Sequence, residues 1–208
     1  MRELAGVPRD LIVPAREIGR AAGITFTIRA PCGCEAEVHV DDFRVYLHAH
    51  GRAYTRNFNN AHELAHFIRA LHDGAFPHDE ARADWTALAL LMPRAPVLEV
   101  VRRLGLHAPR AITAAFPDVP PAWAYLRAAW VSGRAAAVHR DGERLVWAPE
   151  GFPVPPPGEA WEARLVRKTR VSLRWEPELF GAEAFPLGTL GREGVVVLLP
   201  ETMAASGW

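Results

Sequence analysis

The chain has 208 residues, half of them hydrophobic, and its 24 lysine and arginine residues equal its 24 aspartate and glutamate residues. The balanced charge gives no reason to expect a nucleic-acid or membrane partner, and the length suits an ordinary domain with a smaller one. No apolar run is long enough for a membrane helix, and the N-terminal Met1-Arg2-Glu3-Leu4 opens no signal peptide. Two cysteines cannot form a disulfide framework, and Cys32 and Cys34 are better explained as turn thiols than as metal ligands with His39. We therefore expect a cytoplasmic protein.

The first predicted elements are one short helix and three strands. Pro14 suits the first turn of a helix that runs to about Ala22 and ends at Gly23. Alternating and β-branched residues then predict strands, the second and third joined at Asp41-Asp42. The predicted strands cover residues 24–28, 37–40 and 43–48.

The central motif is His62-Glu63-x-x-His66, in a stretch whose apolar residues recur at helical spacing. Histidines at positions i and i+4 lie one turn apart on one helical face, so both imidazoles can bind one metal ion at about 2.0–2.1 Å. Glu63 points about 100° away from His62 around the helix axis. There it can take a proton from a water that the metal activates, which is the chemistry of a metallopeptidase.

A second acidic motif follows that helix. Glu80 and Asp84 are again four residues apart, at the start of another predicted helix that Pro93 ends. Glu80 is predicted to be the third metal ligand, and Asp84 to accept the second N–H of a ligand histidine and so fix its tautomer. His78 and Asp79 are alternative ligands, although neither has an acidic residue one turn further along.

These motifs together resemble the ImmA/IrrE family of metallopeptidases. The residues that carry the resemblance are Arg56–His66, Glu80–Trp85 and Leu90–Pro93. It covers about residues 14–131 and implies an α+β, minimal gluzincin-like fold, with His62, His66 and Glu80 as metal ligands and Glu63 as general base. It also implies site-specific cleavage of a helix-turn-helix repressor in a stress or mobile-element response. We expect zinc as the metal, with manganese as the alternative. Asn57, between the arginine and the phenylalanine of the motif, departs from the family pattern.

Residues 94–131 predict further helices, at about 97–104, 108–116 and 121–131. Phe116–Pro120 and Arg127 resemble the small helix-turn-helix-like end of the same family. Between Arg94 and Arg144 there are eight arginines and four acidic residues, which is a modest surplus. We therefore expect a packing element or a platform for a protein substrate rather than a surface that reads DNA.

Residues 132–208 predict a small β-rich domain beside the metallopeptidase domain of residues 1–131. Asp141-Gly142 predicts a hairpin between strands at 135–139 and 144–147, and residues 194–199 predict an apolar strand. Prolines between positions 149 and 157 predict a stiff loop. Alternation over 164–175 predicts a further strand with one basic face, formed by Arg164, Lys168, Arg170 and Arg174. The simplest interpretation is a solvated face, and the alternative is a face that recruits an acidic partner.

The sequence thus predicts a zinc-dependent endopeptidase with a protein substrate. The main alternative is a non-catalytic, repressor-binding regulator with a metal-stabilised peptidase fold, although such a binder would not need Glu63 as a base. A metal-dependent hydrolase of a small substrate is a third interpretation. Candidates for stabilising the oxyanion rest on nearness in sequence alone. They are Tyr46, His48, His50 and Tyr54.

Overall fold

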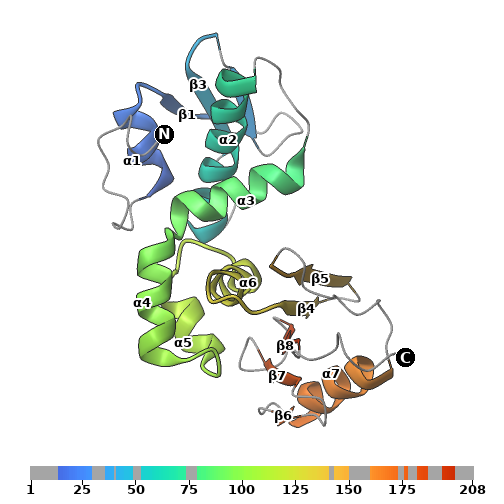
Figure 1. Cartoon of the computed structure of the whole chain (residues 1–208). Helices are drawn as coiled ribbons and strands as arrows, with labels where there is room; N and C mark the ends of the chain where they lie inside the picture. Colours follow the sequence, from blue (N-terminus) through green and yellow to red (C-terminus); the bar gives the residue numbers. More distant parts are fainter. Residues whose placement is uncertain are drawn as a thin grey trace. The chain divides into compact units, whose positions relative to one another are not determined.

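The computed structural model describes residues 14–29, 36–39, 41–48, 53–73, 79–140, 143–149, 160–172, 176–177, 182–186 and 194–199. Helices are combined with two small sheets (Figure 1), which agrees with the predicted α+β class. The chain divides into two compact units. The first unit is Met1–Pro96 with Pro117–Pro120, and the second is Val97–Phe116 with Pro121–Trp208.

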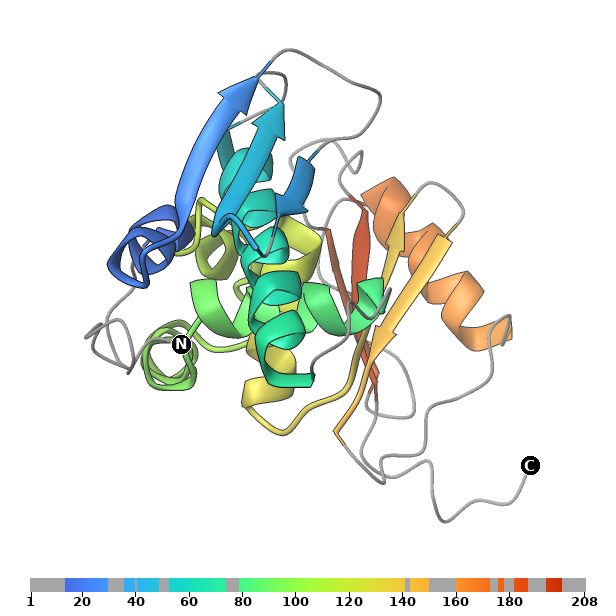
Figure 2. The same ribbon diagram turned by 90° about the horizontal axis from the view of Figure 1, so that it is seen from above.

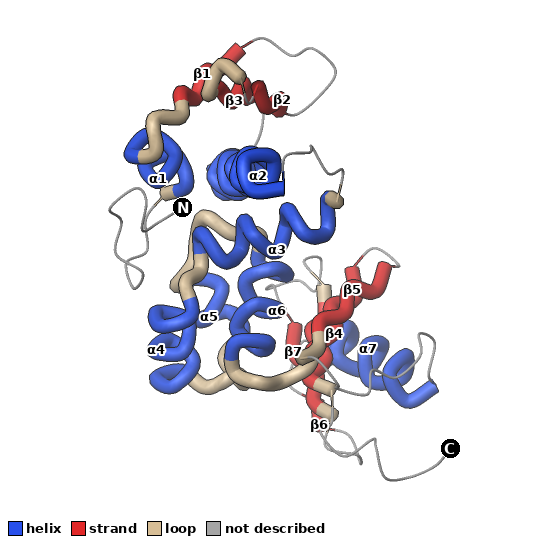
Figure 3. The backbone as a smooth tube through the Cα atoms, turned by 45° about the horizontal axis from the view of Figure 1, so that its top comes forward, coloured by secondary structure: helices blue, strands red, loops and turns tan. Residues whose placement is uncertain are grey.

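The described residues of the first unit form a three-stranded sheet and three helices. Its elements are α1 (Ala15–Ala21), β1 (Thr25–Arg29), β2 (Ala36–His39), β3 (Arg44–His48), α2 (Ala53–Asp73) and α3 (Glu80–Leu91). β3 lies in the middle of the sheet, parallel to β1 and antiparallel to β2 (Figure 2). α1 and α2 lie between this sheet and α3 (Figure 3). The first helix and the three strands lie within one or two residues of their predicted bounds.

The core of the first unit fixes the rotation of α2. Phe26 of β1 and Val45 of β3 are neighbours in register on the inner face of the sheet, and both are buried. Leu64 and Phe67 of α2 are fully buried in the same cluster. Because α2 presents these apolar residues to the sheet, another side of the helix is left to carry polar groups toward α3. Gly19 of α1 is also required here, since a Cβ at this position would overlap the ring of Phe26.

Two further contacts hold α2 within this unit. Asn57, the departure from the family motif, accepts a hydrogen bond from the backbone N–H of Ala15 at 3.2 Å. α1 begins after Pro14 without a side-chain cap of its own, so Asn57 satisfies one of its free N–H groups. Phe43 adopts a φ of 52° in the turn before β3, and its ring packs edge-on against Phe67 with centroids 5.3 Å apart.

The second unit contains a five-stranded antiparallel sheet. Its elements are α4 (Arg94–Leu104, which begins in the first unit), α5 (Pro109–Ala114), α6 (Pro121–Val131), β4 (Ala136–Arg140), β5 (Glu143–Trp147), α7 (Ala160–Ser172), β6 (Glu176–Pro177), β7 (Glu183–Pro186) and β8 (Val195–Leu198). The strand order is β5-β4-β8-β7-β6. The predicted hairpin and final apolar strand are confirmed, whereas Asp141-Gly142 and residues 150–157 of the predicted loop lie outside the described residues.

The central strands of this sheet are buried on both faces, which explains the continuous apolar sequence of β8. Ala137 and Val197 are paired in register and belong to the core cluster that contains Leu165 of α7. The alternate residues, Val138 and Val196, are also fully buried, and α6 contacts β4, β5 and β8. α6 and α7 thus lie on opposite sides of the sheet (Figure 3). Each helix of the described residues is too short or too polar to span a membrane.

One predicted strand is wrong, because residues 160–172 form the helix α7. Its buried positions recur at helical spacing and are Glu162, Leu165, Val166 and Thr169. The alanine, arginine, leucine and lysine residues of this segment favour a helix, and the helical period prevails over the alternation. The basic face changes accordingly: Arg164 and Lys168 stay together one turn apart, and the exposed Arg167 joins them. Arg170 lies about 240° around the helix from Arg164, and Arg174 lies outside the described residues.

Candidate metal centre

Three of the predicted ligand residues meet where α2 packs against α3. Nε2 of His62 lies 3.0 Å from Nε2 of His66 and 2.9 Å from Oε2 of Glu80. Nε2 of His66 lies 3.5 Å from Oε1 of Glu80. Within the described residues, this is the one group of histidine, cysteine and acidic side chains whose donor atoms could hold a metal ion, all within 4.8 Å of one another.

The separations of these donor atoms fit a bound metal ion. Two ligand atoms at about 2.0–2.1 Å from a tetrahedral ion are themselves about 3.3 Å apart, and the three observed separations lie on both sides of this value. Nδ1 of His62 lies 2.8 Å from Oδ1 of Asp84, so the ring donates this N–H and, in its neutral form, presents a lone pair at Nε2. That lone pair faces a second imidazole and a carboxylate, an arrangement that a cation among the three atoms would stabilise.

The two histidines experience opposite electrostatic environments. Burial lowers the pKa of His62, but the hydrogen bond to Asp84 and the negative charges of Asp84, Glu63 and Glu80 outweigh burial and raise the pKa above its ordinary value. For His66, burial and the positive charge of His62 together lower the pKa, against an opposing contribution from Glu80. His66 is thus favoured in the neutral form that a metal requires, whereas His62 must release its proton to bind.

Glu63 combines burial with nearness to the ligands. Burial raises the pKa of Glu63 to about 7, while the charge of His62 opposes this rise and that of Glu80 adds to it. A carboxyl group with such a pKa can both accept and return a proton near neutral pH. A divalent cation held by the neighbouring residues would lower the pKa of Glu63 and favour its carboxylate form.

A contact that the sequence did not predict lies at the start of α3. Oδ1 of Asp79 accepts a hydrogen bond from the backbone N–H of Arg82 at 3.0 Å and caps the helix. Oδ2 of Asp79 forms an ion pair with Nη1 of Arg69 of α2, at 3.8 Å. Asp79, an alternative ligand on sequence grounds, therefore has one carboxylate oxygen bonded to the α3 backbone and the other near the guanidinium of Arg69, and His78 lies outside the described residues.

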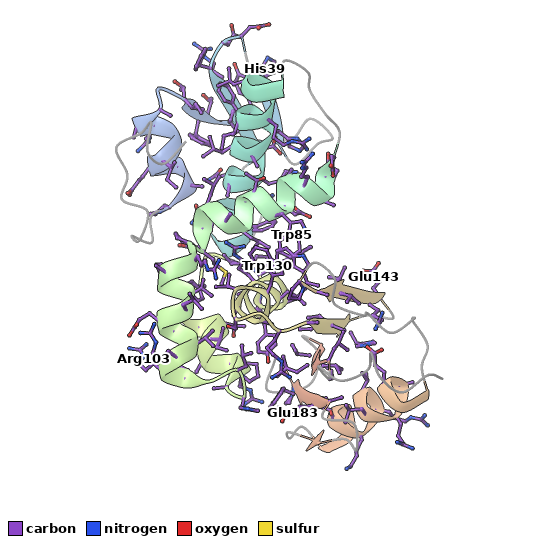
Figure 4. All side chains as sticks on the ribbon, in the orientation of Figure 1. His39, Trp85, Arg103, Trp130, Glu143 and Glu183 are labelled. Carbon is purple, nitrogen blue, oxygen red and sulfur yellow. The ribbon has the colours of Figure 1, made fainter. Side chains whose placement is uncertain are left out.

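The residues suggested for oxyanion stabilisation gain no support. Tyr46 alternates along β3 with Val45, which is buried against α2, so Tyr46 points to the other face of the sheet. Its ring packs edge-on against His39, with centroids 5.0 Å apart, and Figure 4 labels His39 on this sheet. The side chains of His48 and Tyr54, and the whole of His50, lie outside the described residues.

The second unit contains another buried polar cluster that the sequence did not predict. Nε2 of His139 on β4 lies 2.6 Å from Oε1 of Glu162 on α7. Arg144 of β5 donates to both oxygens of Glu162, through Nε to Oε1 and through an Nη atom to Oε2, each at 2.9 Å. Burial raises the pKa of Glu162, but the hydrogen bonds from His139 and Arg144 outweigh burial and lower it overall. This cluster attaches α7 to the β4–β5 hairpin.

The comparisons with known proteins concern the fold. No family model and no curated protein matches the chain. Among solved structures, a Mycobacterium tuberculosis transcriptional regulator is similar, with a TM-score of 0.57 and 14% sequence identity over 100% of this chain and 90% of the other. At this identity the similarity establishes a related fold.

Proposed function

We propose that this chain is a zinc-dependent endopeptidase of the ImmA/IrrE type that makes a site-specific cut in a helix-turn-helix repressor. The observation that carries the proposal is the convergence of His62 and His66 of α2 with Glu80 of α3, with Glu63 next to His62 on α2. The minimal gluzincin-like core belongs to the proposal. It is supported by a helix with the His-Glu-x-x-His motif between a small sheet and α3.

In the proposed mechanism each residue has a separate task. A zinc ion, when bound, supplies Lewis acidity toward the scissile carbonyl and the attacking water. His62, His66 and Glu80 hold the ion, and Asp84 keeps the hydrogen of His62 on Nδ1. Glu63, which a bound cation would keep in its carboxylate form, takes a proton from the attacking water and returns it to the leaving amine.

The repressor substrate and the choice of zinc over manganese come from the family resemblance and from the donor set. Two imidazoles and one carboxylate are a ligand set found in zinc hydrolases, where the fourth position stays open for water and substrate. The related fold belongs to a protein named a transcriptional regulator, which is in line with a role in transcription. That name also favours the second candidate, a regulator that binds a repressor without cutting it.

The deciding experiment compares cleavage by the wild-type chain and by Glu63→Gln. The substrate is a helix-turn-helix repressor encoded beside this chain's gene. Wild-type protein with zinc should give two fragments in a chelator-sensitive reaction, whereas an unstructured, casein-like chain should be cut poorly. Glu63→Gln should keep its zinc and lose about 10²–10⁴-fold in rate. Glu17→Gln, which changes an exposed glutamate of α1, is the matched control.

The outcomes separate the candidates. Cleavage by Glu63→Gln at the wild-type rate would show that the assigned general base is wrong. Wild-type protein that holds zinc and binds the repressor without cutting it would favour the non-catalytic regulator. Equal cleavage of the repressor and the unstructured chain would indicate a general protease instead.

A further inference from the structure

We infer that Arg69 and Asp79 are positioning residues that set the place of Glu80 in the metal site. Neither residue contributes a ligand atom to the group of His62, His66 and Glu80. The inference rests on the proposed function, because it concerns how the third ligand of the proposed zinc site is held.

Glu80 needs such support because of where it lies. It is the first residue of α3, and its side chain is 66% exposed, so little packing restrains the carboxylate. The first turn of a helix lacks intrahelical partners for its N–H groups and frays easily unless it is capped. The position of the Glu80 carboxylate therefore depends on where the α3 backbone begins relative to α2.

Asp79 fixes that starting point through its two oxygens. Oδ1 caps the first turn of α3 at the N–H of Arg82, and Oδ2 faces the guanidinium of Arg69, which belongs to α2. Arg69 follows His66 by three residues, so it lies nearly one turn further along the ligand helix. Its side chain is only 12% exposed, so its guanidinium is more restricted than that of a surface arginine. One carboxylate thus joins the cap of α3 to the helix that carries both histidines.

A second attachment lies on the other side of Glu80. Asp84 accepts the Nδ1–H of His62 at 2.8 Å, so α3 is attached to α2 both one residue before Glu80 and four residues after it. Between these points Glu80 meets both imidazoles. Loss of the Arg69–Asp79 pair would leave the Asp84 attachment in place but would release the first turn of α3, where Glu80 lies. A partly exposed ion pair adds little to global stability, so metal affinity should change more than folding.

The experiment measures the zinc affinity of the full chain by competition with a chromophoric chelator. Arg69→Met keeps most of the aliphatic stem and removes the charge, and Asp79→Asn keeps a good helix cap and removes the charge. Each change should weaken zinc binding about tenfold, the lower end of the loss typical for residues that orient metal ligands. The double variant should lose no more than either single variant, because each already breaks the same pair. Arg82→Met, at an exposed arginine on the first turn of α3, is the control and should bind zinc like the wild type.

Repeating the Arg69→Met change in a variant that lacks Glu80 separates positioning of Glu80 from a general effect on the fold. In Glu80→Ala the third ligand is absent, so adding Arg69→Met should cause no further loss of zinc affinity. The inference is overturned if Arg69→Met weakens binding equally with and without Glu80, or if it leaves the zinc affinity of the otherwise wild-type chain unchanged. A wild-type chain that binds no zinc would instead overturn the proposed function, and this inference with it.

Discussion

Two polar clusters among the described residues, those at His62 and at Glu162, join a histidine to a carboxylate on another element, and they differ in what neutralises the carboxylate. In the second unit, Arg144 donates two hydrogen bonds to Glu162, whose side chain is 2% exposed, and His139 adds a third. In the first unit, no arginine or lysine of the described segments bonds to Glu80 or Asp84, the acids that meet His62. The cluster at His62 brings lone pairs together, whereas the cluster at Glu162 contains its own cation, Arg144.

This difference shows how a structural cluster can be told from a binding site. A buried carboxylate is tolerated when it is paired and hydrogen-bonded, and the cluster at Glu162 meets both conditions from within the chain. At His62 and His66 the converging ring nitrogens that could bind a metal are satisfied only by a proton or by a metal ion. A histidine–carboxylate contact is therefore weak support for function by itself, and the balance of donors and acceptors around it is more informative.

The largest expected effect is the loss of zinc binding when a ligand histidine is removed. His62→Ala or His66→Ala leaves two of three ligands, so tight binding of about one zinc per chain should disappear. His139→Ala changes the same residue type in the cluster that contains its own cation, and should leave zinc content unchanged. Zinc measured per chain after dialysis tests both expectations, and loss of zinc from the His139 variant would break the comparison.

The second largest effect should be on stability, where a change in the Glu162 cluster should matter and a change in the metal centre should not. Glu162→Gln removes a buried charge from Arg144 and His139, and breaking a buried ion pair from one side costs about 3–5 kcal/mol. Glu80→Gln changes an exposed side chain and should alter the free energy of unfolding of the metal-free protein by less than about 0.5 kcal/mol. Urea unfolding of both variants without metal provides the measurement, and equal destabilisation would contradict the distinction.

Asp84 provides an intermediate test within the first cluster. Asp84→Ala removes the acceptor that holds the hydrogen of His62 on Nδ1, and such losses typically cost 10–100-fold in metal affinity or activity. Asp84→Asn offers an oxygen acceptor without the charge and should recover part of the loss. Zinc affinities of the two variants decide this, and an Asp84→Ala variant with wild-type affinity would remove Asp84 from the site.

The two clusters should also respond to acid in different pH ranges. His62 has a raised pKa and must lose its proton to bind metal, so zinc affinity should fall by up to about tenfold per pH unit as the pH drops below that raised pKa. Glu162 has a pKa below its ordinary value of 4.5. Its contribution to stability is therefore fully present above that ordinary value, which holds in the unfolded chain, and is lost as the pH falls through the lower, folded-state pKa.

Zinc affinity and unfolding free energy should be measured from pH 8 to pH 3. Zinc affinity should decline in a first step, at higher pH, and the unfolding free energy of the metal-free protein should decline only in a second step, at lower pH. A single common step would show that the second cluster does not hold its carboxylate as described.

Local spacing made much of the first unit predictable. His62 and His66, like Glu80 and Asp84, are four residues apart, and a helix converts that spacing into a shared face without any knowledge of the fold. Apolar periodicity around the first pair was long enough to identify α2. The predicted convergence needed only one further assumption, that α3 returns along α2.

Partners distant in sequence could not be predicted in this way. Glu162 lies 23 residues from His139 and 18 from Arg144, and only the packing of α7 on the sheet brings them together. α7 was itself predicted as a strand, because a short alternating run competes with a helical period over so few residues. Asp79 shows a further limit of the sequence. An aspartate just before a helix looks the same in the sequence whether it caps the helix or binds a metal ion.

The smallest expected effect concerns the basic face of α7, where Arg164 and Lys168 are exposed one turn apart. If this face recruits an acidic substrate, the double change Arg164→Glu with Lys168→Glu should slow cleavage of the repressor about threefold at low salt, because charges at the edge of an interface chiefly raise the association rate. The difference should vanish near 1 M salt, where the Debye length is about 3 Å. Zinc content should stay at the wild-type value, since these residues belong to the unit that does not contain the metal centre. Wild-type rates at both salt concentrations would leave α7 with a solvated face, and the second unit's contribution would then lie in its packing alone.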